Sequence, residues 1–231
     1  MSIAENIAQV RTNIAQACAQ AGRSPEEITL VGASKMNDAA ACREAIAAGI
    51  DALGENRVQE MTAKLADNAY DGAPLHFIGH LQRNKVKQVV GKVALIQSVG
   101  SMELLEEIEK VAAREQLVQD ILLEVNIGRE EAKSGFAPEA VTAAAAAALA
   151  LPHVRVRGLM TIPPADADRD ANMRYFQEVQ ALYVDINTKL FHNELKCLSM
   201  GMSGDYMDAI RCGATMVRVG TAIFGARNYN I

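Results

Sequence analysis

The segment EITLVGASK, residues 27–35, has the apolar pattern of a buried strand and ends in a lysine. Only small residues, Gly32 to Ser34, stand directly before Lys35. Because removing an ammonium group from water costs free energy unless a partner compensates, this placement is unusual. Two interpretations are open at this point: a lysine that forms a Schiff base, and an ordinary solvated lysine where a strand passes into a loop.

Further apolar runs alternate with helical patterns along the rest of the chain. We predict strands at 27–35, 52–56, 75–80, 93–99, 121–127, 155–162, 197–203 and 216–225, and an extra amphipathic helix at 2–21 before the first strand. Eight strands that alternate with helices favour an α/β protein with a parallel (β/α)8 TIM barrel, in a single domain over residues 1–231. An open, doubly wound sheet is the alternative.

The composition is typical of an ordinary soluble globular protein. Half of the residues are apolar, and the net charge of −5 argues against a broad electrostatic footprint for nucleic acid. A local basic cluster of Arg83, Lys85, Lys87 and Lys92 is interpreted as a solvated helix face. The chain has no apolar run of about 18 residues and no signal-peptide pattern at its start. We therefore expect a cytoplasmic protein without membrane or nucleic-acid partners.

The four cysteines are scattered along the chain. Cys18, Cys42, Cys197 and Cys212 form no CxxC pair and have no histidine neighbours at ligand spacing. The sequence therefore predicts neither a disulfide framework nor a metal site, and reduced thiols are the expectation.

Polar residues stand at the carboxyl ends of the predicted strands. In a barrel those ends meet at one mouth, where active sites lie. The residues expected to converge there are Lys35, Asn56, His80, Asn126, Thr161, Ser203 and Gly220.

Two loops near the C-terminus have the composition of a phosphate site. A phosphate often binds a barrel at the loops after strands 7 and 8, near the start of a short helix. The loop GMSGD at 201–205 offers backbone N–H groups and the Ser203 hydroxyl, and Gly220 and Thr221 follow the last strand. Glycines that merely form turns are the alternative. Both loops together favour phosphate binding.

Arg218 lies between two valines in the last strand, so alternation points its side chain away from theirs. A cation inside or at the rim of a barrel needs an acceptor or an anionic ligand. The structural interpretation pairs it with a carboxylate such as Glu55 or Glu124. The functional interpretation places it against a ring nitrogen or a carboxylate of a cofactor.

Six segments match a known family in both sequence and order. They are ASK (33–35), GENRVQE (54–60), HFIGHLQRNK (76–85), LEVNIGREEAKSG (123–135), LSMGMSGD (198–205) and VRVGTAIFGAR (217–227). With these segments the chain resembles the pyridoxal phosphate homeostasis proteins, which are similar to the barrel half of alanine racemase. The resemblance implies a protein that binds pyridoxal 5′-phosphate (PLP) and takes part in intracellular PLP homeostasis and cofactor supply.

The resemblance also implies roles for single residues. Lys35 would form the Schiff base, Arg218 would face the pyridine nitrogen, and Asn56 and Met200 would line the ring. Ser203, Gly220 and Thr221 would hold the phosphate. The predicted cofactor-binding set is Lys35, Asn56, His80, Met200, Ser203, Arg218, Gly220 and Thr221.

A second lysine and one departure concern the release of the cofactor. Lys133, in KSG, matches a lysine that the family links to cofactor transfer, with apo forms of PLP-dependent enzymes as the expected recipients. Many bacterial members carry another lysine two places after the Schiff-base residue, where this chain has Asn37. An exchange route through that position is therefore in doubt here. The resemblance also implies a monomer.

We predict cofactor binding without robust catalysis, and hence no catalytic residues. An arginine at the ring nitrogen weakens the ring as an electron sink, because a guanidinium keeps that nitrogen unprotonated. A racemase also needs a second acid/base, and nothing in the spacing requires Tyr206, Tyr229 or His80 to serve. The alternative is that Tyr206 lies on a helix surface, that Tyr229 belongs to the tail, and that His80 forms hydrogen bonds at a strand end. A small PLP-dependent amino-acid racemase is the alternative function, and a class I aldolase that uses Lys35 is a third.

Overall fold

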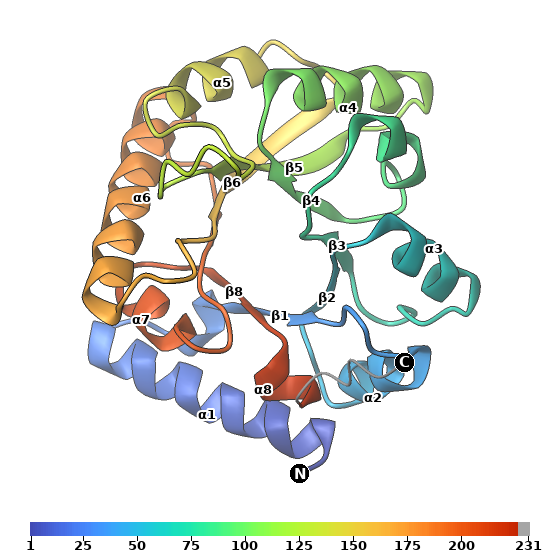
Figure 1. Cartoon of the computed structure of the whole chain (residues 1–231), viewed down its shortest axis with the longest axis vertical. Helices are drawn as coiled ribbons and strands as arrows, with labels where there is room; N and C mark the ends of the chain where they lie inside the picture. Colours follow the sequence, from blue (N-terminus) through green and yellow to red (C-terminus); the bar gives the residue numbers. More distant parts are fainter. Residues whose placement is uncertain (226–231) are drawn as a thin grey trace.

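Each predicted apolar run overlaps a parallel strand, and the strands close into a barrel in sequence order (Figure 1). The computed structural model describes residues 1–225. The strands are β1 (Thr29–Ala33), β2 (Ala52–Glu55), β3 (Leu75–Phe77), β4 (Leu95–Val99), β5 (Gln119–Val125), β6 (Val154–Thr161), β7 (Cys197–Ser199) and β8 (Met216–Val219). The (β/α)8 prediction is confirmed, and the open sheet is wrong because β1 pairs with β8.

Helices surround the barrel (Figure 1). They are α1 (Ile3–Ala21), α2 (Ala39–Ala47), α3 (Val58–Ala66), α4 (Met102–Arg114), α5 (Val141–Ala148), α6 (Arg169–Leu190), α7 (Tyr206–Arg211) and α8 (Thr221–Phe224), with 3-10 helices η1 (Pro25–Glu27) and η2 (Arg83–Gln88). The extra N-terminal helix is confirmed as α1, which Ser2 caps through a hydrogen bond from the Glu5 amide. It lies along α7 and α8 (Figure 1).

Two segments differ from their predicted form. The run predicted as a strand at 216–225 stops at Val219, because Gly220 leaves the extended conformation (φ −108°, ψ −82°) and is the N-cap residue of α8. The basic cluster does not lie on an α-helix, since its central part is the 3-10 helix η2. Its side chains at Arg83, Lys87 and Lys92 are exposed, as expected for a solvated face.

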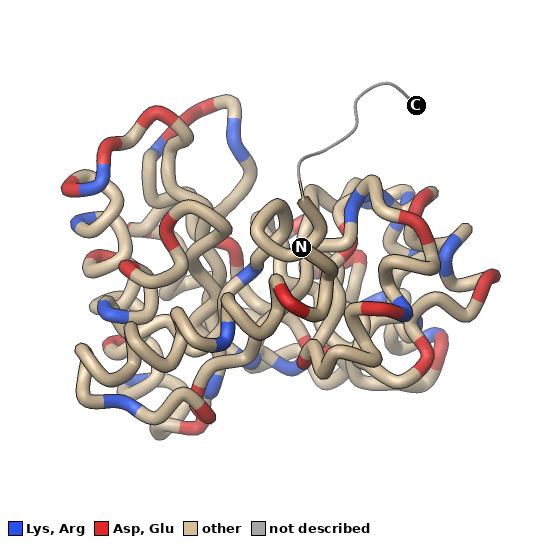
Figure 2. Tube along the Cα trace, turned by 90° about the horizontal axis from the view of Figure 1, so that it is seen from below, with Lys and Arg blue, Asp and Glu red and all other residues tan. Residues whose placement is uncertain are grey.

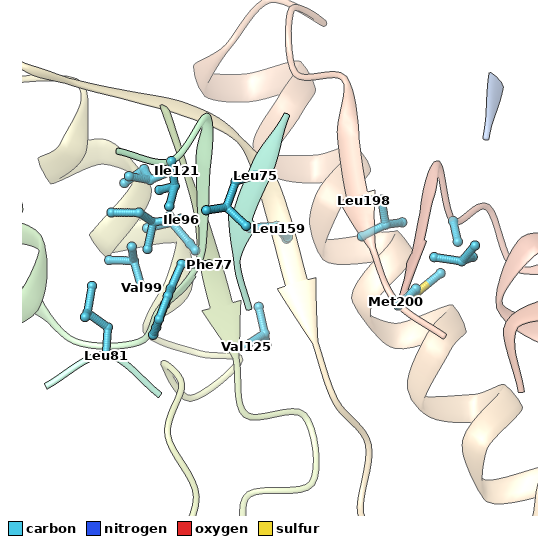
Figure 3. Close-up of a cluster of buried hydrophobic side chains, with 14 of the residues drawn as sticks. Leu75, Phe77, Leu81, Ile96, Val99, Ile121, Val125, Leu159, Leu198 and Met200 are labelled. Carbon is cyan, nitrogen blue, oxygen red and sulfur yellow. The ribbon is translucent and has the colours of Figure 1, made fainter. Parts of the chain in front are cut away.

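Strand alternation divides the buried side chains into two sets. One set fills the barrel interior and contains Val31, Ala52, Leu95, Leu122, Met160 and Met216. The other set packs between the barrel wall and the helices, and Figure 3 shows part of it, including Phe77, Ile96 and Leu198. Two residues beyond Leu95, Leu122 and Met216, towards the carboxyl ends, stand Gln97, Glu124 and Arg218. The interior therefore changes from apolar to polar towards the mouth.

The surface and the thiols add few chemical features. Lys and Arg positions are interspersed with Asp and Glu around the molecule in the view of Figure 2. All four cysteines are unpaired thiols, and Cys197 alone among them is not fully buried. Within residues 1–225, no group of three or more His, Cys, Asp or Glu side chains is placed to hold a metal ion. None of the helices in this described part is long and apolar enough to cross a membrane.

Candidate functional site

Lys35 lies in a tight turn directly after β1. The Asn37 amide donates to the Ser34 carbonyl (3.1 Å), and the Asn37 side-chain amide donates to the Lys35 carbonyl (3.1 Å). Met36 has a φ of 62°, the positive value that a type II turn requires at its third position. Asn37, which departs from the family pattern, thus closes the turn that carries the lysine.

Arg218 occupies the polar part of the barrel interior and is only 4% exposed. Its guanidinium donates to the Ser199 hydroxyl (2.5 Å) and to the Thr161 carbonyl (2.8 Å). Burial lowers the pKa of Arg218 to about 10, against the charges of Glu124 and Asp205 that raise it, so the group stays cationic at neutral pH. The prediction that Arg218 points away from Val217 and Val219 is confirmed, since both valines pack in the outer set.

The hydrogen bonds of Arg218 continue across the barrel. The Ser199 hydroxyl donates to Gln97 Oε1 (2.7 Å), and Gln97 Nε2 lies 3.0 Å from His76 Nδ1. Burial lowers the pKa of His76 to about 4, so the ring is neutral at neutral pH and can accept from the Gln97 amide. This chain of side chains fixes the guanidinium, and neither Ser199 nor Gln97 was predicted from the sequence as a site residue.

Of the two carboxylates proposed to pair with Arg218, Glu124 is the one whose charge acts on the guanidinium. Burial raises the pKa of Glu124 to about 6, against the charge of Arg218, which lowers it. Glu124 Oε2 is buried without a hydrogen-bond partner. Glu55, in contrast, bonds to Lys64 of α3, so the alternative pairing with Arg218 is wrong.

The loops after β7 and β8 meet at the residues predicted to bind a phosphate. The backbone N–H groups of Gly220 and Ala222, at the start of α8, both point to Ser203 Oγ, at 3.1 and 3.3 Å. Gly201 has a positive φ of 92°, and its carbonyl accepts from the Arg218 amide (3.0 Å), which ties the loop after β7 to strand β8. Thr221 is the first residue of α8 and is exposed. The structure brings the predicted phosphate residues together.

Two residues expected to line a cofactor ring have different surroundings. Asn56 follows β2, and its Oδ1 is buried without a hydrogen-bond partner, the state of an atom that a ligand can satisfy. A Cβ atom on Gly79 would lie 2.3 Å from the Asn56 carbonyl oxygen, so only glycine permits this approach of the loop after β3. Met200 is fully buried beside Leu198 in the outer hydrophobic set (Figure 3). Its side chain packs the core, and its contact with a cofactor ring stays a prediction.

The long loop after β5 reaches the loop after β3. His80 Nδ1 lies 2.6 Å from the Ser134 hydroxyl, and Lys133 forms an ion pair of 2.5 Å with Glu130. Asn126, directly after β5, holds this loop through its side-chain amide, which donates to the Glu130 carbonyl (2.8 Å). Lys133 is therefore placed on an exposed loop that begins at the barrel mouth.

The surroundings of Tyr206, one of the residues considered as a second acid/base, do not support that role. Tyr206 is buried, and its hydroxyl accepts a hydrogen bond from the Asn13 side chain of α1 (2.9 Å). The interpretation of Tyr206 as a surface residue is therefore wrong as well, because α1 covers it. Tyr229 lies outside the described residues.

A charged cluster behind the Lys35 turn was not identified from the sequence. Lys64, Glu55 and Tyr70 are buried, and Glu55 Oε1 accepts from Lys64 (2.7 Å), from Tyr70 (3.1 Å) and from the Ser34 hydroxyl (2.6 Å). Glu60, one helical turn before Lys64, also accepts from the Lys64 ammonium (2.8 Å). The available signal was the carboxylate of Glu55 inside a buried strand, together with the i,i+4 spacing of Glu60 and Lys64.

Comparisons with known proteins agree with this fold. Residues 6–228 match the family model "Alanine racemase, N-terminal domain". The pyridoxal phosphate homeostasis protein of Aquifex aeolicus is 42% identical over 99% of this chain and 100% of its own. The solved structure of PipY from Synechococcus elongatus with PLP bound is 32% identical, with a TM-score of 0.85 over 97% of this chain and 100% of that one.

A more distant structure shares the fold alone. Alanine racemase of Clostridium difficile is 18% identical, with a TM-score of 0.73, and it is matched over 99% of this chain and 58% of its own. The family model and the full-length relative together settle the family. The chain belongs to the alanine racemase N-terminal domain family and, within it, to the pyridoxal phosphate homeostasis proteins.

Proposed function

We propose that this protein binds PLP through Lys35 and serves PLP homeostasis and cofactor supply in the cytoplasm, without sustained turnover. One contact carries the proposal. A Cβ atom built on Gly220 would lie 3.5 Å from the Cβ of Ala33, and Ala33 stands two residues before Lys35. A lysine amine and a cradle for an anion therefore belong to neighbouring strand ends.

The residues at the mouth fit the chemical parts of PLP. When bound, PLP supplies an aldehyde that adds an amine, a ring nitrogen that accepts a hydrogen bond, and a phosphate dianion. Lys35 offers the amine, and Arg218 offers guanidinium N–H donors. The N–H groups of Gly220 and Ala222 lie within hydrogen-bond distance of the Ser203 hydroxyl at the start of α8, and this grouping of donors supports a phosphate site there. The similarity to PipY, which has been solved with PLP, supports the same assignment.

The charges of the site favour holding the cofactor over changing substrates on it. A lysine adds to an aldehyde as the neutral amine. The positive charge of Arg218 disfavours the protonation of an amine nearby. A cation beside the ring nitrogen also disfavours its protonation, whereas enzymes that use the ring as an electron sink offer it a carboxylate. Of the acid/base candidates within the described residues, Tyr206 is held by α1, and His80 pairs with Ser134.

Release of the cofactor is the second part of the proposal. We expect a monomer that passes PLP to apo forms of PLP-dependent enzymes, with Lys133 taking part in the transfer. Its position on the loop after β5 supports this role, because that loop is anchored at the mouth by Asn126 and His80.

Proton exchange on an amino acid tests the proposal. The PLP-loaded protein is incubated with L-alanine in deuterated water, and the α-proton is followed by NMR. We expect no exchange beyond the amount of protein present. Continuous exchange or racemisation over many turnovers would show an enzyme and contradict the carrier function.

A further inference from the structure

The cluster of Glu55, Glu60 and Lys64, which we call the turn clamp, lies next to the turn that carries Lys35. Lys64 is 6% exposed, and its ammonium donates to three oxygens: the Ser34 carbonyl (2.9 Å), Glu55 Oε1 (2.7 Å) and Glu60 Oε1 (2.8 Å). An ammonium has three N–H donors, so all of them are used. A buried cation with this complete set of partners is expensive to build, and the function proposed above gives it no role.

Every acceptor of Lys64 is connected to the residues beside Lys35. The Ser34 carbonyl directly precedes Lys35, and the Ser34 hydroxyl donates to the same Glu55 oxygen that Lys64 binds. On the other side of Lys35, the Met36 amide donates to the Glu60 oxygen that Lys64 binds. The turn clamp therefore holds both flanks of the lysine through one ammonium.

The turn needs this support because Met36 has a left-handed conformation. A φ of 62° is unfavourable for a residue other than glycine and persists only where the surroundings impose it. The Met36 amide and the Ser34 carbonyl are the two main-chain groups that the clamp binds around Lys35. Without the clamp, the strain at Met36 favours other turn conformations, in which the Lys35 amine points elsewhere.

The clamp acts from outside the barrel. Glu55 alternates with Gly54 and Asn56 along β2, and on the outer side of the barrel it accepts hydrogen bonds from Lys64 of α3 and from Tyr70. Burial by itself lowers the pKa of Lys64, but the charge of Glu55 and the hydrogen bonds that the ammonium donates to both carboxylates raise it above its ordinary value. The ammonium is thus permanently charged at neutral pH, and it bonds to the turn rather than to the mouth.

We propose that Lys64, with Glu55 and Glu60, is a positioning group that sets the direction of the Lys35 amine for PLP binding. The proposal rests on the proposed function, because it gives Lys35 the cofactor as its partner. Removal of a purely structural clamp would change the stability alone. Removal of a positioning clamp changes the affinity for PLP and the protection of the turn from hydrogen exchange.

The test compares Glu60→Ala and Lys64→Met with a matched control, Asp120→Ala. Glu60 and Asp120 have the same side-chain exposure of 21%, and both form ion pairs, but Asp120 lies at the opposite end of the barrel, at the start of β5. Three quantities are measured for each protein: PLP affinity by absorbance, hydrogen exchange of the Met36 amide without PLP, and the midpoint of urea unfolding.

We expect Glu60→Ala to weaken PLP binding by about 10-fold or more, since a charge-assisted hydrogen bond to the turn is lost. The Met36 amide should exchange faster, while Asp120→Ala keeps the wild-type affinity and exchange. If Lys64→Met fails to fold, Glu60→Ala, which changes a half-buried residue, still decides between a positioning clamp and a purely structural one. Wild-type affinity and exchange in Glu60→Ala would overturn the positioning proposal. A wild-type protein that forms no bond from Lys35 to PLP would instead overturn the proposed function.

Discussion

The guanidinium of Arg218 donates a hydrogen bond of 2.5 Å to the hydroxyl of Ser199 on the neighbouring strand. Ser199 in turn donates to Gln97, which lies against the neutral His76. The direction of the arginine is thus fixed by protein groups before any ligand arrives. Such preorganisation lowers the entropy lost on binding, because the side chain is already ordered.

Glu124, the carboxylate near Arg218, makes the stability of the protein depend on pH. Burial raises its pKa from an ordinary 4.5 to about 6, so between these values the folded state binds more protons than the unfolded state. The stability that the neutral carboxyl gives is complete below pH 4.5 and is lost as the pH rises through 6. The loss corresponds to about 2 kcal/mol in the free energy of unfolding.

Replacement of this carboxyl by an amide tests that dependence. In Glu124→Gln, urea unfolding at pH 4.5 and pH 7 should show a gain over wild type that is larger at pH 7 by about 1.5 kcal/mol. His76 titrates in both proteins, so its effect cancels in the difference. An equal difference between the variant and the wild type at the two pH values would show that the pKa of Glu124 is not raised in the folded protein.

Ser203 is predicted to recognise the phosphate of the cofactor. Loss of a hydrogen bond to a charged group costs about 1.5–3 kcal/mol, so Ser203→Ala should weaken PLP binding by about 10- to 100-fold. Pyridoxal, which lacks the phosphate, should bind the variant and the wild type equally. Equal losses for PLP and pyridoxal would show a general disturbance of the loop. Ser101→Ala, which removes the N-cap of α4, is the control for a change in stability alone.

Lys133 is predicted to speed the transfer of PLP to an apo-enzyme. An amine held near the site reacts as an intramolecular nucleophile, so Lys133→Ala should slow transfer by about 10-fold or more. Lys110→Ala is the matched control, because Lys110 is also an exposed lysine paired to a glutamate three residues before it. Transfer by Lys133→Ala at the wild-type rate would remove this lysine from the mechanism.

Tyr206 is predicted to stabilise the fold and to leave the cofactor unaffected. Tyr206→Phe removes the hydroxyl that accepts from Asn13, which should lower the free energy of unfolding by about 1 kcal/mol. The affinity for PLP and the absorbance of the loaded protein should not change. A changed absorbance would place the tyrosine at the cofactor and revive the racemase alternative.

The barrel was predictable because its main signals are local. Apolar runs of strand length alternate with capped helical segments, and alternation alone separated Arg218 from Val217 and Val219. The same reasoning predicted where the strands end, and therefore which residues lie at the mouth of the barrel. The end of the last strand at Gly220 was harder to predict, because the apolar run continues through α8.

Contacts between distant segments were not predictable in the same way. Periodicity shows that Glu55 is buried, but it does not show that Lys64 reaches it from α3. Likewise, α1 covers Tyr206 through a contact between residues 13 and 206, which no local pattern announces. Met200 stands at a strand end, yet its side chain joins the outer hydrophobic set because the strand face decides its direction. Which side chains contact each other, and which face of a strand points outward, is determined only when the barrel closes.

The identity of the lysine that binds PLP is the most direct test of the account. Purified protein is mixed with PLP, reduced with borohydride, digested and examined by mass spectrometry. We predict a visible absorption band that reduction removes, and a pyridoxyl phosphate group on Lys35 in stoichiometric amount. Lys35→Ala should show neither. Labelling spread over several lysines, or undiminished labelling of Lys35→Ala, would contradict the claim that Lys35 holds the cofactor.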